Sequence, residues 1–136
     1  MKYWLGVASE EHVMLGVKGG FCQLNHGKAA PLHRMHEGDW IIYYSPKKSL
    51  KAVEKLQAFT AVGQIADDEI IQVSESESFQ PFRRSVNYFT NVRPVPLAEV
   101  SSHPQWKENN SRLRFGHFEM TRELFSWITE KMGLVL

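Results

Sequence analysis

The stretch HEGDWIIYYSPK, residues 36–47, constrains the fold of this chain more than any other. An acidic, glycine-containing turn precedes five consecutive aromatic or β-branched residues, Trp40 to Tyr44, the composition of a buried strand. Ser45 and Pro46 are expected to end that strand, because proline supplies no amide hydrogen to a ladder and biases the preceding residue toward an extended conformation. The end of this strand therefore carries tyrosines, a hydroxyl and lysines. These side chains could bind a flat, partly polar ligand, or they could simply form part of the core and the end of the strand.

The length of 136 residues predicts a single domain spanning residues 1–136, with a substantial buried core. No apolar run is long enough to cross a membrane, and the N-terminus lacks a signal-peptide pattern, so we expect a cytoplasmic protein without membrane contact. The one cysteine, Cys22, excludes an internal disulfide. A monomer is the expected state.

The net charge of +1 argues against a protein that coats long phosphate backbones by electrostatics alone. Any contact with nucleic acid must therefore be local. Basic residues do gather in short blocks, which are either solvated faces or phosphate contacts: Lys47, Lys48, Lys51 and Lys55, Arg83 with Arg84, and Arg112 with Arg114.

The first half of the chain predicts a strand at 3–8, followed by a helix that Ser9 caps and that runs to about Val17. Paired glycines at 19–20 end this helix, since glycine adopts the left-handed conformation that closes helices. Residues 21–28 read as a loop with unusual side chains, and strands are expected at 58–66 and 69–73.

The second half predicts a strand at 82–93, a loop at 101–110 anchored by Trp106, a strand at 113–120 kinked at Gly116, and a final helix at 122–132. Five or six short, irregularly spaced strands among short helices indicate an α+β domain around a strongly curved sheet or barrel.

Motifs of common enzyme classes are absent: there is no G-x-S-x-G elbow and no glycine-rich phosphate loop. Cys22 and His26 could form a nucleophile and base, but burial of the cysteine as a small apolar residue is the simpler interpretation. His26, His33 and His36 lie close in sequence without a zinc motif, so we expect no metal, no cofactor and no catalytic residue.

With enzyme motifs and a metal site unsupported, ligand recognition is the remaining kind of function. Sixteen aromatic residues occur, and several adjoin polar side chains, as in Phe79-Gln80 and Phe82-Arg83-Arg84. A base that has left a helix is recognised by stacking on aromatic rings and by hydrogen bonds to its edge. The aromatic and polar neighbours in this sequence could provide both interactions. The alternative is that most of these rings fill the core.

Five segments resemble the EVE domain family of the PUA-like superfamily: YWLGVAS, GGFCQLNHGKAAPLHRMHEGDWIIYYSPK, AFTAVGQIADDE, PFRR and FGHFEMT. The similarity covers about residues 3–125. It implies a PUA-like pseudo-barrel of five to six strands with short flanking helices, related to YTH and ASCH domains. It also implies a pocket for a modified base of DNA or RNA, and no established enzymatic reaction.

The resemblance to YTH domains implies that the pocket is built from the loop after the first helix, the end of the central strand and the last strand. The predicted ligand-binding residues are Trp4, Phe21, Asn25, His26, Lys28, Tyr44, Ser45, Phe79, Arg83 and Phe115. The predicted phosphate contacts are Lys47, Lys48 and Arg84, together with Arg83.

Three functional hypotheses follow. The first is a non-enzymatic module that accepts a flipped, modified nucleobase of DNA or RNA. The second is a small-molecule or nucleotide-processing enzyme of ASCH-like type, which would use the loop that holds Cys22, His26 and Lys28. The third is a protein-interaction domain.

Overall fold

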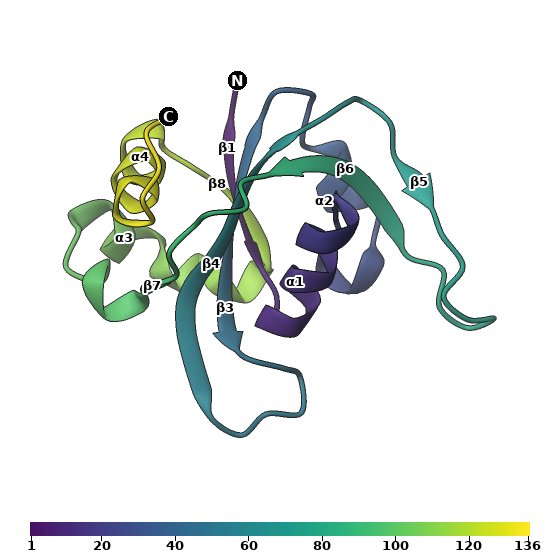
Figure 1. Ribbon diagram of the computed structural model, residues 1–136, viewed down its shortest axis with the longest axis horizontal. Helices are drawn as coiled ribbons and strands as arrows, with labels where there is room; N and C mark the ends of the chain where they lie inside the picture. Colours follow the sequence, from purple (N-terminus) through teal and green to yellow (C-terminus); the bar gives the residue numbers. More distant parts are fainter.

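The computed structural model describes residues 1–136 as a curved sheet with helices on both sides (Figure 1). The strands are β1 (Tyr3–Val7), β2 (Phe21–Cys22), β3 (Trp40–Lys47), β4 (Lys55–Ile65), β5 (Ile71–Gln72), β6 (Phe82–Tyr88), β7 (Val95–Pro96) and β8 (His117–Met120). The α-helices are α1 (Glu10–Gly19), α2 (Ala30–His33), α3 (Pro104–Asn109) and α4 (Arg122–Lys131), and 3₁₀ turns are η1 (Asn25–Gly27), η2 (Leu97–Glu99) and η3 (Asn110–Phe115).

The sheet is mixed and curls into a half-barrel. Its strand order is β2-β6-β4-β3-β1-β8, with β5 paired to β6 and β7 paired to β4. The pair β1–β3 is parallel and the other pairs are antiparallel. The predicted α+β fold around a strongly curved sheet is confirmed, with eight strands where five to six were predicted, and the central strand lies in the middle of the sheet as expected.

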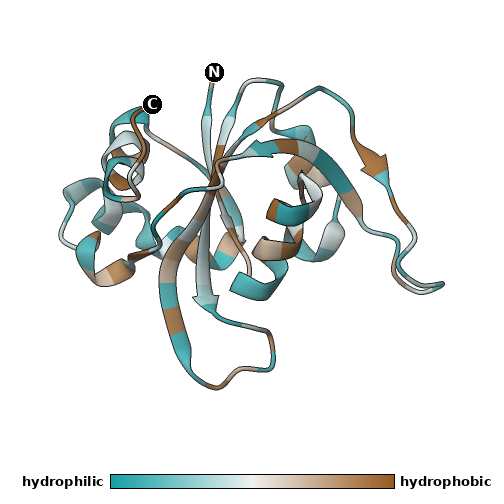
Figure 2. Cartoon of the chain, viewed as in Figure 1, coloured by the Kyte–Doolittle hydropathy of each residue, from teal (hydrophilic) through white to brown (hydrophobic).

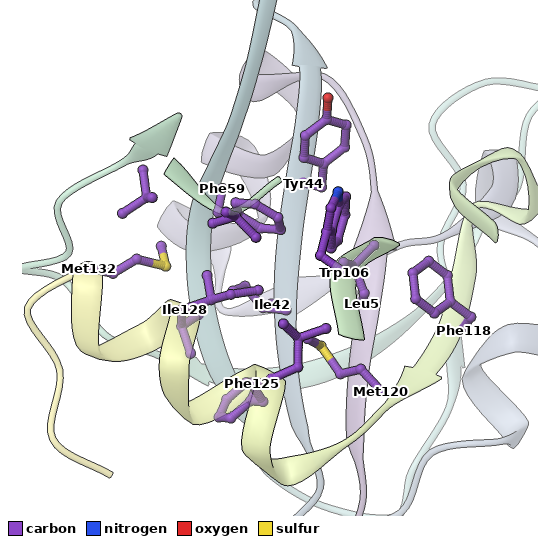
Figure 3. Close-up of a cluster of buried hydrophobic side chains, with 14 residues drawn as sticks. Leu5, Ile42, Tyr44, Phe59, Trp106, Phe118, Met120, Phe125, Ile128 and Met132 are labelled. Carbon is purple, nitrogen blue, oxygen red and sulfur yellow. The ribbon is translucent and has the colours of Figure 1, made fainter. Parts of the chain in front are cut away.

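Two separate hydrophobic cores form, one on each face of the sheet, because successive residues of a strand point to opposite faces. We call the face covered by α3 and α4 the C-terminal face (Figure 1). Its core holds fourteen buried residues, among them Phe125 of α4 and the rings of Tyr44, Phe59 and Trp106, which lie together in Figure 3.

We call the face covered by α1 and α2 the N-terminal face. Its core is built around Trp4, Ile41, Tyr43 and Leu32. Ile41 and Tyr43 therefore belong to one core, whereas their neighbours Ile42 and Tyr44 belong to the other.

The helix boundaries follow the capping signals of the sequence. The Ser9 hydroxyl accepts the His12 N–H, and Gly20 ends α1 with φ 73°. The Thr121 hydroxyl accepts the Leu124 N–H at the start of α4. These predictions are confirmed.

Several boundaries were predicted wrongly. Strand β3 does not end at Ser45 but continues to Lys47, because a bulge between Ser45 and Lys47 accommodates Pro46 without a ladder hydrogen bond. Residues 101–110 are not a loop throughout. They contain the helix α3, which His103 caps and whose Trp106 is buried.

Two strands are shorter than the sequence predicted. Strand β5 covers two residues only, and its Ile71 is half exposed, so the brown strand of Figure 2 lies at the surface. Strand β6 ends at Tyr88.

None of the helices is long and apolar enough to pass through a lipid bilayer.

Candidate functional site

A cleft of about 600 Å³ opens on the N-terminal face, between the start of α1, the turn η1, the turn η3 and the loop that joins β3 to β4. Its volume lies within the range of small-molecule sites, roughly 300–1,000 Å³. The residues that line it are Val7, Ala8, Ser9, His12, Leu15, Gln23, Asn25, His26, Lys28, Leu50, Glu75, Phe79, Leu113, Arg114, Phe115 and Gly116.

The turn η1 presents polar side chains to this cleft through an unusual backbone. Asn25, His26 and Gly27 have φ values of 47°, 60° and 81°, so three consecutive residues adopt the left-handed conformation. Such a conformation is costly for residues other than glycine and concentrates at functional sites. Gly27 lies so close to Pro81 that an added Cβ would approach the Pro81 Cβ to 2.3 Å. The tight packing of Gly27 holds the exposed His26 at the cleft.

Asn25 ties this turn to the last strand. Its Nδ2 donates to the carbonyl oxygen of Phe115 at 3.4 Å. Its Oδ1 lies 2.1 Å from the position that a Cβ on Gly116 would take, and Gly116 has φ 75°. Only glycine therefore fits at 116, and it lets the Asn25 amide pack directly on the backbone of residues 115–116.

Two phenylalanine rings line the cleft and stay accessible to solvent. Phe79 is 36% exposed and Phe115 is 55% exposed. The Arg114 guanidinium lies 5.1 Å from the centroid of the Phe115 ring. Exposed rings beside a cation are suitable for stacking on a flat ligand.

Gln23 is a buried amide in the wall of the cleft, and Arg83 holds it in place. Arg83 Nε donates to Gln23 Oε1 at 2.9 Å, and its Nη2 is paired with Glu75. The same guanidinium lies over the ring of Phe21 at 3.9 Å. Because arginine can only donate, the Gln23 oxygen must face Arg83, and the amide nitrogen is the atom left for a ligand.

A second hollow, of about 460 Å³, adjoins the cleft. Asn25 and Phe115 line both, so these residues form the wall between them. The other lining residues are Trp4, Arg34, Arg112, His117, Phe118 and Glu119. Two arginines thus stand beside a cleft that offers rings and amides.

His117 is the most unusual group in this second hollow. It is 2% exposed and stacks on Trp4 at 4.8 Å, with 12° between the ring planes. Neither Nδ1 nor Nε2 has a hydrogen-bond partner in the protein. Burial, together with the positive charge of Arg34, lowers the pKa of His117 to about 4, so the imidazole is neutral at pH 7.

Asp39 fixes the Trp4 ring against which His117 stacks. Its carboxylate accepts the Trp4 indole N–H at 3.0 Å and the backbone N–H groups of Lys2 and His36 at 2.9 and 3.0 Å. Burial alone would raise the pKa of Asp39, but these donors outweigh it and lower the pKa. Asp39 is therefore ionised at neutral pH and holds Trp4 in position.

The structure gathers five of the predicted ligand-binding residues at the cleft: Asn25, His26, Lys28, Phe79 and Phe115. Trp4 lines the second hollow instead, and Phe21 and Arg83 lie behind Gln23. Lys47 and Lys48 are exposed where β3 leaves the sheet. The role of these residues in binding stays a prediction.

Tyr44 and Ser45 were placed at the pocket by the sequence, and the structure puts them in the interior. Tyr44 is 4% exposed and packs against Phe59 and Trp106 on the C-terminal face. Ser45 is fully buried and shares a hydrogen bond of 2.7 Å with Thr60. The error was one residue of strand phase, since Tyr43 is the tyrosine that points to the N-terminal face and donates to the Gln23 carbonyl.

Arg84 was predicted to contact phosphate, and the structure contradicts this. Its side chain is 3% exposed and donates to the carbonyl oxygens of Leu32, Met35 and Asp67. These hydrogen bonds use the guanidinium to support the loops around it.

The Cys22 thiol is buried, and desolvation raises its pKa to about 12. Only the thiolate is an effective nucleophile, so Cys22 is unsuited to that role in this conformation.

Gln23, Arg34 and His117 at the two hollows were not predicted from the sequence, and Arg112 and Arg114 were noted only as a basic pair. The signal for Gln23 was its place beside Asn25 and His26 in a loop without periodicity. No sequence signal connects Arg34 with His117, because the two residues are 83 positions apart in the chain and only the tertiary fold brings them together. No group of three or more His, Cys, Asp or Glu side chains converges as a metal site would require.

The sequence model of the family named EVE domain matches residues 2–131, so the chain belongs to the EVE domain family.

Similar proteins of known sequence belong to the group designated UPF0310. The protein from Streptococcus sanguinis is 53% identical over 133 residues, which cover 98% of this chain and 94% of that protein. The protein from Helicobacter hepaticus is 51% identical, with 97% of each chain covered, and YdcG of Bacillus subtilis is 38% identical, with 97% and 92% covered.

Solved structures with the same fold are much more distant in sequence. Human THYN1, in complex with DNA that contains 5-methylcytosine, superimposes with a TM-score of 0.60 at 16% identity, with all of both chains covered. Rpa0253 of Rhodopseudomonas palustris gives a TM-score of 0.61 at 21% identity, with 100% and 96% covered. These likenesses establish the PUA-like, EVE-type fold of the chain.

Proposed function

We propose that this protein is a nucleic-acid-binding module that accepts an extruded, modified base in the cleft and acts by binding alone. The observation that carries the proposal is the convergence of two exposed rings, Phe79 and Phe115, with the amides of Asn25 and Gln23 in one hollow of nucleotide size. Rings stack on the face of a base, and amides can both donate to and accept from its edge.

The second hollow supports the same proposal. Arg34 and Arg112 line it and flank the wall that Asn25 and Phe115 form, so a base in the cleft would have its phosphate within reach of both arginines. Arginine is suited to bidentate contacts with phosphate. These two residues take the place of Arg84 as candidate phosphate contacts, and Lys47 and Lys48 remain candidates.

The family supports the proposal from a different direction. THYN1, which shares the fold, is held in a complex with DNA that contains 5-methylcytosine. We propose a related ligand class here, DNA or RNA with a modified base.

Fluorescence anisotropy with a panel of oligonucleotides tests the proposal. The panel contains DNA and RNA strands that are unmodified or carry 5-methylcytosine, 5-hydroxymethylcytosine or N6-methyladenine, at one fixed low salt concentration. We expect at least one modified strand to bind about tenfold more tightly than its unmodified match. Equal, weak binding across the panel would contradict the proposal.

Conservative substitutions in the cleft locate the binding site. Phe79→Leu and Phe115→Leu keep an apolar side chain and remove the ring, so each should weaken binding by roughly 1–3 kcal/mol. Arg122→Ala, an exposed cation at the start of α4 on the opposite face, is the control and should bind like the wild type. A nucleotide turnover screen with His26→Ala and Lys28→Ala tests the enzymatic alternative, which would predict a reaction lost in both variants.

A further inference from the structure

The loop that joins β3 to β4 concentrates the positive charge of this protein. Residues 47–55 hold four lysines and one glutamate, a net charge of +3. The remaining twelve basic and fourteen acidic side chains give −2, so the rest of the chain is slightly acidic. Lys47, Lys48, Lys51 and Lys55 are all exposed. A polyanion is therefore attracted to this loop rather than to the surface as a whole.

The tip of the same loop is apolar. Leu50 is 81% exposed and Val53 is 92% exposed, and both stand among the lysines. In Figure 1 the loop projects from the end of β3 and β4 beyond the rest of the molecule. Neither side chain belongs to a hydrophobic core of the protein.

The loop stands at the rim of the cleft. Leu50 lines the cleft together with Lys28 and Phe79. The backbone N–H of Glu11 in α1 donates to the Lys48 carbonyl at 2.8 Å, which fixes the start of the loop beside the cleft. The apolar tip, the lysines and the base site are thus neighbours.

This arrangement fits a specific step in recognition. A base in a duplex is stacked and paired, and it must leave the helix before a cleft of this kind can hold it. Proteins that kink DNA insert Leu, Ile, Phe or Met side chains between base steps and so unstack them. Lysines on the flanking phosphates would bring an apolar tip to the base stack.

We propose that the β3–β4 loop is a wedge for base-paired nucleic acid: its lysines contact phosphates, and Leu50 and Val53 enter the base stack and occupy the space left by the extruded base. The proposal rests on the function proposed above, since it assumes that the cleft holds that base. It identifies the ligand as a duplex and assigns to the loop a role that a single strand does not need.

The test compares two forms of one DNA strand that carries 5-methylcytosine beside 2-aminopurine, annealed to its complement or left single-stranded. The variants are Val53→Ser and the double variant Leu50→Ser/Val53→Ser. Anisotropy gives the affinity, and 2-aminopurine fluorescence reports unstacking. Both substituted side chains are exposed, and thermal unfolding checks that each variant keeps the wild-type Tm.

If the loop is a wedge, Val53→Ser, which lies outside the cleft lining, loses several-fold in duplex affinity and part of the rise in 2-aminopurine fluorescence, while its affinity for the single strand stays within about twofold of the wild type. The double variant loses about tenfold or more in duplex affinity, and this loss exceeds any loss of single-strand affinity that Leu50 causes as part of the cleft wall. Lys47→Ala/Lys48→Ala lowers the salt dependence of duplex binding, and Lys107→Ala/Arg122→Ala, with the same change in net charge, does not.

Two outcomes overturn the wedge. Variants that bind the duplex as the wild type does show that the tip stays outside the base stack. Equal loss with duplex and single strand shows that Leu50 is only part of the cleft wall. Failure of the proposed function is distinguishable from both, because then the wild type itself would not prefer the methylated single strand and Phe79→Leu would change nothing.

Discussion

The two faces of the sheet use the same strands for different purposes. On the C-terminal face, α3 and α4 close a core of fourteen apolar residues with Trp106 and Phe59 at its centre (Figure 3). On the N-terminal face the core is smaller and shares its interior with the hydrogen-bonded side chains of Asp39, Arg84 and Gln23. Because buried polar groups need partners, the second face is held by specific hydrogen bonds and the first by packing. We expect the C-terminal face to supply most of the stability and the N-terminal face to position the proposed site.

The largest effect should come from Trp106→Ala. Trp106 is 2% exposed and packs against Tyr44 and Phe59, so its loss leaves a cavity on the C-terminal face. We expect a loss of about 4 kcal/mol in the free energy of unfolding, measured by urea denaturation. A loss of less than about 1 kcal/mol would show that this face is not the main source of stability. Trp127→Ala, a partly buried tryptophan of α4, should cost less.

Arg84→Ala tests whether the N-terminal face depends on hydrogen bonds. The substitution removes the guanidinium donors of the Met35 and Asp67 carbonyl oxygens, so we expect a loss of about 3 kcal/mol. Arg93, whose side chain is exposed and also donates to a carbonyl, is the matched control, and Arg93→Ala should cost less than about 1 kcal/mol. Equal losses in the two variants would break the contrast between buried and exposed arginines.

Acid should destabilise the protein through His117. The folded pKa is about 4, below the ordinary value of 6.5, so between these pH values the unfolded chain binds a proton that the folded chain does not. The stability contributed by the neutral imidazole is present above pH 6.5 and is lost as the pH falls toward 4, by about 3 kcal/mol in total.

Urea denaturation across this pH range measures the effect. His117→Phe keeps a ring against Trp4 but cannot titrate, so its unfolding free energy should change less between pH 6.5 and 4. A wild-type profile as flat as that of the variant would contradict the assignment. Asp39, whose pKa is lowered from 3.8, affects stability only below this window.

The smallest effect on stability should come from Gly116→Ala, at about 1–2 kcal/mol, because an alanine at φ 75° is strained. Its Cβ also displaces the Asn25 amide, so oligonucleotide binding should weaken more than stability does. Gly133→Ala is the control, since Gly133 has φ 88° and nothing within 4 Å of an added Cβ. Loss of oligonucleotide binding in both variants, or in neither, would show that the position of Asn25 does not matter for binding.

Much of the fold could be read from local chemistry. Ser9 and Thr121 identified the helix starts, the glycines at 20 and 116 identified the turns, and the aromatic run of β3 identified the central strand. Each of these signals acts within a few residues, which is why it is visible in the sequence. The helix α3 was missed because a short segment has a weak periodic signal, and the burial of Trp106 supplies what the local pattern lacks.

The candidate site was only partly predictable. Asn25, His26 and Lys28 occupy one loop, and residue type alone marked them as polar readers. Tyr44 was assigned to the wrong face, because a strand of five apolar residues gives no alternation from which to infer its phase.

The sequence by itself determined the central strand, the two capped helices and the family. Only the tertiary structure decided that Arg84 supports loops, that His117 and Trp4 stack beside Arg34, and that Leu50 reaches the rim of the cleft. The physical reason is that caps, turns and strand composition depend on neighbours along the chain. Burial, charge and the partners of a side chain depend instead on residues that the curved sheet brings together from distant positions.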